Sequence, residues 1–407
     1  MNNSQSNAKI RSIVMLALAQ VAGMGLWFIS SAILGDMLAE ASANGITISA
    51  TSQALMSTMV QAGFVVGALV SAVFGLADRM DPRRFFAVSA IVAAIVNLCL
   101  LTTSLGGNTA VLMRFLTGFA LAGVYPVGLK LAAGWGEKDR GFLVGLLVGA
   151  LTLGSAMPHL FAFLGGADWR LTLMVSSLVA GAGGVLILFT GIGPYHAKAA
   201  SFDPKAIFEI WQNKPIRSAF LGYLGHMWEL YAMWAWLGVA VAAELTVGMQ
   251  NKEALGGDTT IIKLLTFAVV GVGALTCAFG GRLADKIGKA EVTIWAMGIS
   301  AVAAIATAFS LGGPLWITAV FALIWGASVI PDSPQFSAII ADYARPETTG
   351  SLLSLQTAIG FLLTVVTVQG APFVANIYGW QAVFMLMALG PVLGIASMWG
   401  LRRTRAD

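Results

Sequence analysis

Long apolar stretches alternate with short polar loops along the whole chain. Each apolar stretch has roughly 18 to 25 residues, which is the length that lets an α-helix cross a hydrocarbon core of about 30 Å. The pattern therefore predicts an all-α integral membrane protein with twelve transmembrane helices. The predicted spans cover residues 12–38, 49–75, 84–104, 109–133, 140–165, 169–192, 217–244, 260–281, 291–311, 315–340, 349–374 and 380–401.

The composition agrees with a membrane protein. Of the 407 residues, 58% are hydrophobic and only 10% are charged, whereas about a quarter of the residues of a soluble domain are charged. Cys99 and Cys277 both fall inside apolar stretches, so they form neither a disulfide framework nor a CxxC site. The apolar run before Ala17 is too short for a signal-peptide core, and we expect the first span to be uncleaved.

The basic residues give the predicted orientation. An even number of spans places both termini on one side, and that side carries 19 of the 23 Lys and Arg residues. Positive charge near a span end resists translocation, so both termini are predicted to be cytoplasmic, in the cell (inner) membrane. Arg170, Lys252 and Lys263 are the basic residues predicted outside. The net charge of +4 then reflects topology, and we expect no nucleic-acid partner.

The chain is predicted to consist of two similar halves. The loop FGLADRMDPRR at 74–84 returns about 207 residues later as GGRLADKIGKA at 280–290, and Pro126 is echoed by Pro331. The expected units are residues 1–192, a cytoplasmic linker at 193–216 with a short interfacial helix, and residues 217–407. Two parallel six-span repeats form a known transporter architecture, with the substrate site near mid-membrane between them.

The Leu-Ala-Asp-Arg/Lys core of the repeated loop resembles the conserved motif of the major facilitator superfamily, roughly GxLADRxGRR. This resemblance implies a secondary transporter that works by alternating access, without a cofactor and as a monomer in the lipid bilayer. It also implies that Asp78 and Asp285 brace a neighbouring helix end on the cytoplasmic side and help to lock one access state. The second copy keeps Gly281 and Gly288, whereas Phe74, Asp81 and Pro82 depart from the motif in the first. The predicted gating residues are Asp78, Arg79, Arg83, Arg84, Asp285, Lys286, Gly281 and Gly288; the alternative is a solvated turn that obeys the positive-inside rule.

Ionisable residues inside spans are functional candidates, because each is costly in the membrane unless it is paired or hydrated. In the seventh span, His226 and Glu229 lie one turn apart on a face that also carries Met233 and Trp236. We expect Glu229 to be the proton-coupling residue, assisted by His226. The alternative is a static hydrogen bond between the two that fixes helix packing.

The fourth and tenth spans carry further candidates. Arg114 with Gly118 resembles the RxxxG element of the superfamily and is expected to attract an anionic substrate; a structural salt bridge or snorkelling is the alternative. Lys130 and Asp332 are expected to approach each other as a gate pair or as substrate ligands, unless Lys130 belongs to the inner interface. Trp27 and Tyr125 complete the substrate candidates, since the first, fourth, seventh and tenth spans line the cavity in the superfamily.

No P-loop, GxSxG, HExxH or Cys/His metal motif occurs in the sequence, which disfavours ATP-driven transport and metal chemistry. The leading hypothesis is a proton-coupled secondary transporter of a small organic anion. Its rival is proton-driven efflux of an amphipathic or cationic compound, held by Glu229, Asp332 and aromatic rings. A membrane enzyme or receptor that reuses the fold, with His226 and Glu229 as acid and base, is disfavoured by the two matched loops.

Overall fold

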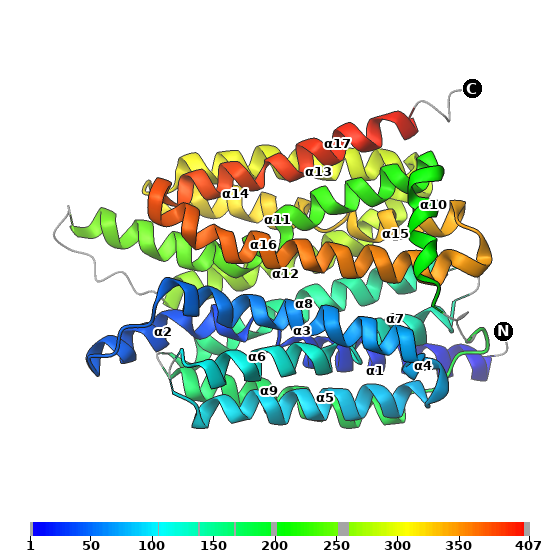
Figure 1. Cartoon of the computed structure of the whole chain (residues 1–407), viewed down its shortest axis with the longest axis horizontal. Coiled ribbons are helices and arrows are strands. Elements are labelled where there is room, and N and C mark those ends of the chain that lie inside the picture. The colour runs from blue at the N-terminus through cyan, green and yellow to red at the C-terminus, as the bar shows by residue number, and fades with distance from the viewer. Residues whose placement is uncertain are drawn as a thin grey trace.

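The computed structural model describes residues 3–104, 106–136, 139–166, 168–196, 202–250 and 260–402. Within these ranges the regular elements are all helices, and Figure 1 shows that the long ones run side by side. They are α1 (Asn3–Met24), α2 (Ile29–Ala43), α3 (Ala50–Phe74), α4 (Leu76–Arg79), α5 (Pro82–Leu98), η1 (Cys99–Thr102), α6 (Asn108–Leu121), α7 (Tyr125–Ala133), α8 (Arg140–Gly165), α9 (Trp169–Leu186), η2 (Ile187–Phe189), η3 (Pro204–Ala206), α10 (Ile207–Gln212), α11 (Lys214–Gln250), α12 (Thr260–Ile287), α13 (Lys289–Ser310), α14 (Leu315–Ser328), α15 (Ser333–Tyr343), α16 (Pro346–Met387) and α17 (Leu389–Arg402).

Ten helical stretches of the described residues are long and apolar enough to cross a membrane. One of them, Glu347–Arg402, has 56 residues and covers two predicted spans, with a backbone interruption at Gly379 where φ is 80°. The ten do not include α11, which has 37 residues and contains the predicted seventh span. A multi-pass helical membrane protein is thus confirmed, while the count of twelve and the cytoplasmic termini stay predictions.

Three of the predicted spans are broken near their middle. The first divides into α1 and α2 at residues 25–28, the fourth into α6 and α7 before Pro126, and the tenth into α14 and α15 around Pro331. Proline suits the first turn of a helix because it lacks the N–H that would be unpaired there. Each break leaves backbone carbonyls without an intrahelical donor at membrane depth, where another group has to satisfy them.

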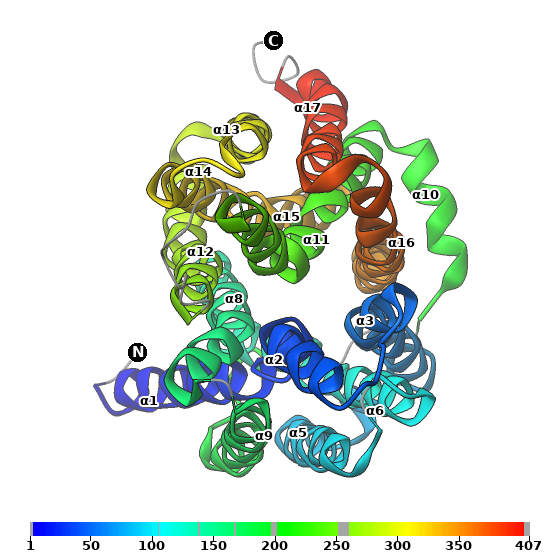
Figure 2. The ribbon, with the colours of Figure 1, turned by 90° about the vertical axis from the view of Figure 1, so that its left-hand side faces the viewer.

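Helices α1–α9 lie to one side of the molecule and α11–α17 to the other, as the end-on view in Figure 2 shows. The two groups meet where α8 packs on α12, α3 on α16, and α2 on α11. The predicted unit boundaries at residues 192 and 216 stay predictions, and a division there would give the two groups of helices seen in Figure 2.

Two glycines explain how α3 and α6 approach so closely. A Cβ atom on Gly118 would overlap the carbonyl oxygen of Val60, and one on Gly63 would overlap the carbonyl oxygen of Phe115. Small residues let the backbones of membrane helices touch, which increases their van der Waals contact. The glycine of the RxxxG element is therefore a packing residue, and it holds the helix that carries Arg114 against its neighbour.

The linker helix α10 is tied to the start of α16. Glu209 of α10 accepts hydrogen bonds from Thr348 Oγ1 at 2.7 Å and from Arg345 at 3.2 Å. Burial opposes ionisation of this carboxyl, but the Thr348 and Arg345 hydrogen bonds outweigh it and lower the pKa of Glu209. The backbone N–H of Asp203 also donates to Ser351 Oγ at 2.9 Å. The short helix predicted in the linker thus has a fixed docking position.

Candidate functional site

Arg114 is fully buried in α6 and donates four hydrogen bonds. Its guanidinium reaches the carbonyl oxygens of Trp27 at 2.6 Å, Leu26 at 3.1 Å and Met56 at 3.3 Å. The fourth bond goes to Asn97 Oδ1 at 3.0 Å. Two of these acceptors belong to the break between α1 and α2, so the arginine supplies donors to carbonyls that the broken helix leaves unpaired.

This geometry differs from the predicted alternatives for Arg114. The side chain neither snorkels outward nor meets a carboxylate among its four acceptors, which are all uncharged. Direct binding of an anionic substrate stays a prediction, and most of the donors it would need are already engaged. Sequence spacing gave no signal for this role, because the break in the first span contains no proline.

His226 lies against Asp332, and both side chains are buried. Its Nδ1 atom is 2.9 Å from Asp332 Oδ1, but the angles at these atoms do not make a hydrogen bond. His226 Nε2 is buried and has no hydrogen-bond partner among the described residues. Asp332 directly precedes α15, so the break in the tenth span positions its carboxyl against α11.

Glu229 has different neighbours from those predicted. Its carboxylate accepts hydrogen bonds from Ser300 Oγ at 2.7 Å and from Trp325 Nε1 at 3.1 Å. These donors belong to α13 and α14, and the side chain is only 1% exposed. The static hydrogen bond between His226 and Glu229 is absent from the described part of the structure, because Glu229 bonds to Ser300 and Trp325 while His226 lies against Asp332.

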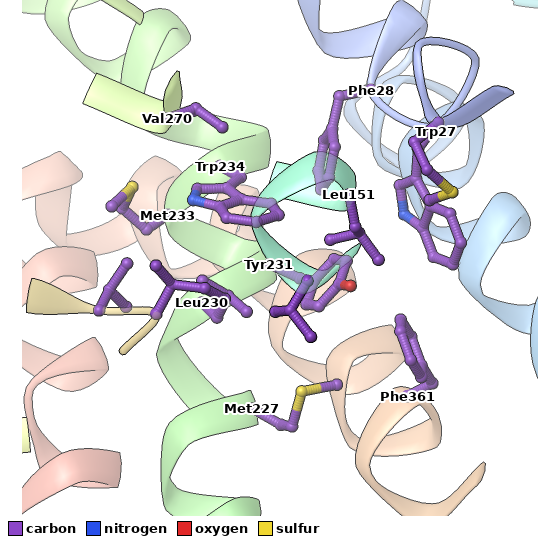
Figure 3. Packing of buried hydrophobic residues seen from close by; sticks show 14 of the residues in the cluster. Trp27, Phe28, Leu151, Met227, Leu230, Tyr231, Met233, Trp234, Val270 and Phe361 are labelled. Atoms are coloured by element: carbon purple, nitrogen blue, oxygen red, sulfur yellow. The ribbon is translucent and has the colours of Figure 1, made fainter. Parts of the chain in front are cut away.

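Aromatic rings from the two groups of helices lie against one another (Figure 3). Ring centroids are 5.3 Å apart for Trp27 and Phe361, 5.8 Å for Trp27 and Tyr231, and 5.7 Å for Phe28 and Tyr231. Such spacings fit tilted or offset packing of aromatic rings. We call this group the interface aromatic cluster; its members are Trp27, Phe28, Phe64, Tyr231, Trp234 and Phe361.

Lys130 and Tyr125, both in α7, are half-buried. The Nζ atom of Lys130 lies 3.4 Å from the carbonyl oxygen of Ala77, in the short helix α4 of the first repeated loop. The structure thus brings Lys130 to the gating loop of its own half, whereas Asp332 contacts His226. A gate pair of Lys130 with Asp332 stays a prediction for another conformation.

In the first gating loop, two residues that depart from the motif, Asp81 and Pro82, form the start of α5. Asp81 caps α5 by accepting from the backbone N–H of Arg83 at 2.9 Å, and Pro82 occupies the first turn. The Arg83 side chain pairs with Asp81 at 2.7 Å and donates to the carbonyl oxygen of Thr190 at 3.1 Å. The Arg83 hydrogen bond lowers the pKa of Asp81 to about 2. The side chain of Asp78 lies outside the described residues, and Arg79 and Arg84 are exposed.

The second gating loop is more open. Asp285 and Lys286 are exposed, and neither makes a hydrogen bond or ion pair with another described residue. Gly288 separates α12 from α13 with φ at 105°, a conformation that favours glycine, whereas Gly281 faces open space. The predicted brace by Asp285 stays a prediction, and it is not engaged in this conformation.

An ion pair that the sequence did not predict joins the two groups of helices. Lys263 at the start of α12 donates to Asp36 Oδ2 of α2 at 2.7 Å and to the carbonyl oxygen of Gly166 at 2.8 Å. Both side chains are only 13% and 14% exposed. The charge pattern had placed both residues near the predicted outer side, but it could not show which acid and base meet.

Two comparisons bear on identity. No curated protein matches the chain significantly. The family described as Major Facilitator Superfamily matches residues 15–329 and, in a second match, 230–407. No group of His, Cys, Asp or Glu residues in the described ranges could hold a metal ion. With a helical multi-pass architecture and a family match over most of its length, the chain belongs to the Major Facilitator Superfamily and is a secondary transporter.

Proposed function

We propose that the protein couples the movement of a small organic solute to protons and exposes its solute site alternately to the two faces of the membrane. The observation that carries the proton coupling is the contact between His226 and Asp332, at 2.9 Å and with both side chains buried. A third ionisable group, Glu229, is buried one helical turn away on α11. We place the protein in the cell (inner) membrane with both termini cytoplasmic, acting as a monomer.

A buried imidazole–carboxylate contact responds strongly to one proton. With His226 protonated and Asp332 ionised, the two charges offset each other's desolvation; with His226 neutral, Asp332 is a buried charge without a counter-ion. Gain or loss of one proton therefore changes how firmly α11 is held against the break in the tenth span.

Alternating access is supported by a difference between the two faces. On the predicted outer side Lys263 and Asp36 join the two groups of helices. On the predicted inner side Asp285 has no hydrogen-bond or ion-pair partner among the described residues. This combination fits a conformation that is closed outside and open inside.

For the cargo, a small organic anion is our first proposal, with Lys130, a half-buried cation of α7, as a candidate partner for its charge. Efflux of an amphipathic or cationic compound is the second, and it is favoured by the carboxyl of Asp332 and by the interface aromatic cluster. The two differ in the sign of the charge that the solute carries.

The test is transport by the purified protein in liposomes with an imposed pH gradient, using a panel of organic anions and amphipathic cations. We expect solute movement to depend on the gradient, and Asp332→Asn and Glu229→Gln to abolish that dependence. Asp342→Asn is the matched control, because Asp342 is an exposed carboxyl of α15 paired with Lys289. Equal transport by the wild type with and without the gradient, or full gradient dependence in both variants, would show the coupling proposal to be wrong.

A further inference from the structure

Two tryptophans differ from all the other buried tryptophans of the described residues. Six tryptophans are at most 8% exposed. Four of them, at positions 135, 169, 236 and 325, donate the indole N–H to an oxygen. Trp27 and Trp234 do not, and each is only 1% exposed. Both belong to the interface aromatic cluster.

A buried donor without an acceptor destabilises the state that contains it, so native proteins rarely keep one without a reason. In Figure 3 the indole nitrogen of Trp27 faces the middle of the cluster, and the Tyr231 hydroxyl points towards the same region. The nitrogen of Trp234 is at the end of its ring away from Phe28. Trp27 is therefore the orphan donor that a molecule between the rings would meet.

Separation of the two groups of helices would expose the flat faces of the aromatic rings that now cover one another. Trp27, Phe28 and Phe64 come from one group, while Tyr231, Trp234 and Phe361 come from the other. Their cross-contacts have centroid separations of 4.6 Å for Phe64 and Phe361 and 5.3 Å for Trp27 and Phe361. Opening uncovers these apolar ring faces, and a planar aromatic solute would cover them again at the spacing that aromatic rings prefer.

The charge behind Trp27 selects an anion. The guanidinium of Arg114 donates to the backbone carbonyl of this same residue at 2.6 Å, and its other acceptors are uncharged. This arginine thus leaves a buried positive charge without a counter-ion among its hydrogen-bond partners, bound to the backbone of the residue that carries the orphan indole donor. A carboxylate accepting from Trp27 would feel that charge without displacing any of the arginine's hydrogen bonds.

We propose that the interface aromatic cluster is the solute site and that the solute is an aromatic carboxylate. Its carboxylate accepts the indole N–H of Trp27, and its ring packs against the faces of Tyr231 and Phe361 that separation of the two groups uncovers. This assignment rests on the proposed transport function, since the site forms only between two groups of helices that move apart. It names the class of organic anion and gives Arg114 an electrostatic role in place of direct contact.

The test measures binding by titration calorimetry on the purified full chain. Four probes separate the contributions: benzoate, cyclohexanecarboxylate with the charge but no flat ring, benzamide with the ring but no charge, and benzylammonium with the opposite charge. We expect benzoate to bind more tightly than the other three. Equal or tighter binding of cyclohexanecarboxylate or benzylammonium, or no binding of benzoate at all, would overturn the assignment.

Trp27→Phe keeps a ring and removes the donor. A hydrogen bond to a charged group corresponds to a loss of affinity for benzoate of roughly 10-fold or more. Trp236→Phe is the matched control, because Trp236 is equally buried but its indole already donates to the Val368 carbonyl at 2.9 Å; it should leave the affinity for benzoate unchanged. Unaltered benzoate binding by Trp27→Phe would contradict the proposal.

Phe361→Leu gives an independent reading, because it removes a ring and no polar group. It should lower the affinity for benzoate while leaving that for cyclohexanecarboxylate unchanged, and an equal loss of affinity for both would contradict ring stacking.

The proposed solute class and the proposed proton coupling can fail separately. Benzoate binding that depends on Trp27, in a protein whose transport ignores the pH gradient, would refute proton coupling and keep the solute class.

Discussion

Replacing Arg114 by methionine is expected to destabilise the protein itself, and not only to weaken a ligand. Its guanidinium holds the carbonyl oxygens of Leu26 and Trp27 at 3.1 Å and 2.6 Å, at the point where the first span is not helical. Methionine fills much of the same volume but donates no hydrogen bond. Both carbonyls would then be left without this donor in the protein interior.

The size of the effect follows from those two groups. A buried polar group that loses its partner costs about 1 to 3 kcal/mol, so the pair predicts a loss of about 2 to 6 kcal/mol. Arg114→Lys keeps the charge, but one ammonium group cannot reproduce donors directed at four separate acceptors. We therefore expect Arg114→Lys also to be destabilised, to a smaller extent.

The assay is denaturant unfolding of the purified variants in mild detergent. Arg170→Met serves as the control, because Arg170 is an exposed arginine that pairs with Glu40 at 2.6 Å, and exposed pairs contribute little. The reasoning would be refuted if Arg114→Met unfolded at the wild-type midpoint, or if Arg114→Lys were fully stable while retaining solute binding. Either result would show that the hydrogen bonds of Arg114 do not hold the break in the first span.

Three further outcomes can be checked. Asp36→Asn removes the ion pair with Lys263 and should open the predicted outer side more often, measured as faster labelling of a cysteine introduced there between the halves. If the pair closes that side, the exchanged pair Asp36→Lys with Lys263→Asp should restore the wild-type labelling rate. Gly118→Ala should lower the yield of folded protein because its methyl group overlaps a neighbouring backbone, whereas Gly281→Ala faces open space and should be neutral. The pKa of Asp81 is about 2 in the folded protein and about 3.9 in the unfolded chain. Its contribution to the free energy of unfolding is therefore fully present above about pH 4 and is lost as the pH falls towards 2. Unfolding measured across this pH range should show no such loss in an Asp81→Asn variant.

Much of the fold follows from the sequence, because hydrophobic length is a strong signal in membrane proteins. The helices fall where the apolar stretches were placed, but none of the three breaks was predicted, although Pro126 and Pro331 lie at two of them. The break at 25–28 contains no proline. It depends on donors from Arg114, which is distant in the sequence.

The pairing of ionisable residues was less predictable, for a geometric reason. Residues three apart on an α-helix differ by about 60° around its axis, so His226 and Glu229 are near each other in sequence but face different helices. His226 meets Asp332, whereas Glu229 meets Ser300 and Trp325. A serine or tryptophan inside an apolar stretch resembles any other packing residue until the neighbouring helix is in place.

The break in the first span makes α2 a lever. Asp36 lies seven residues beyond Ile29, the first residue of α2, or about 10 Å along the helix axis at 1.5 Å per residue. A tilt of about 10° at the break would carry Asp36 sideways by about 2 Å at that helical rise, far enough to part it from Lys263, 2.7 Å away. The break contains Trp27, so a molecule bound to its indole ring acts directly at the point about which α2 tilts. A small shift there is therefore enlarged at Asp36, whose pairing with Lys263 closes the predicted outer side.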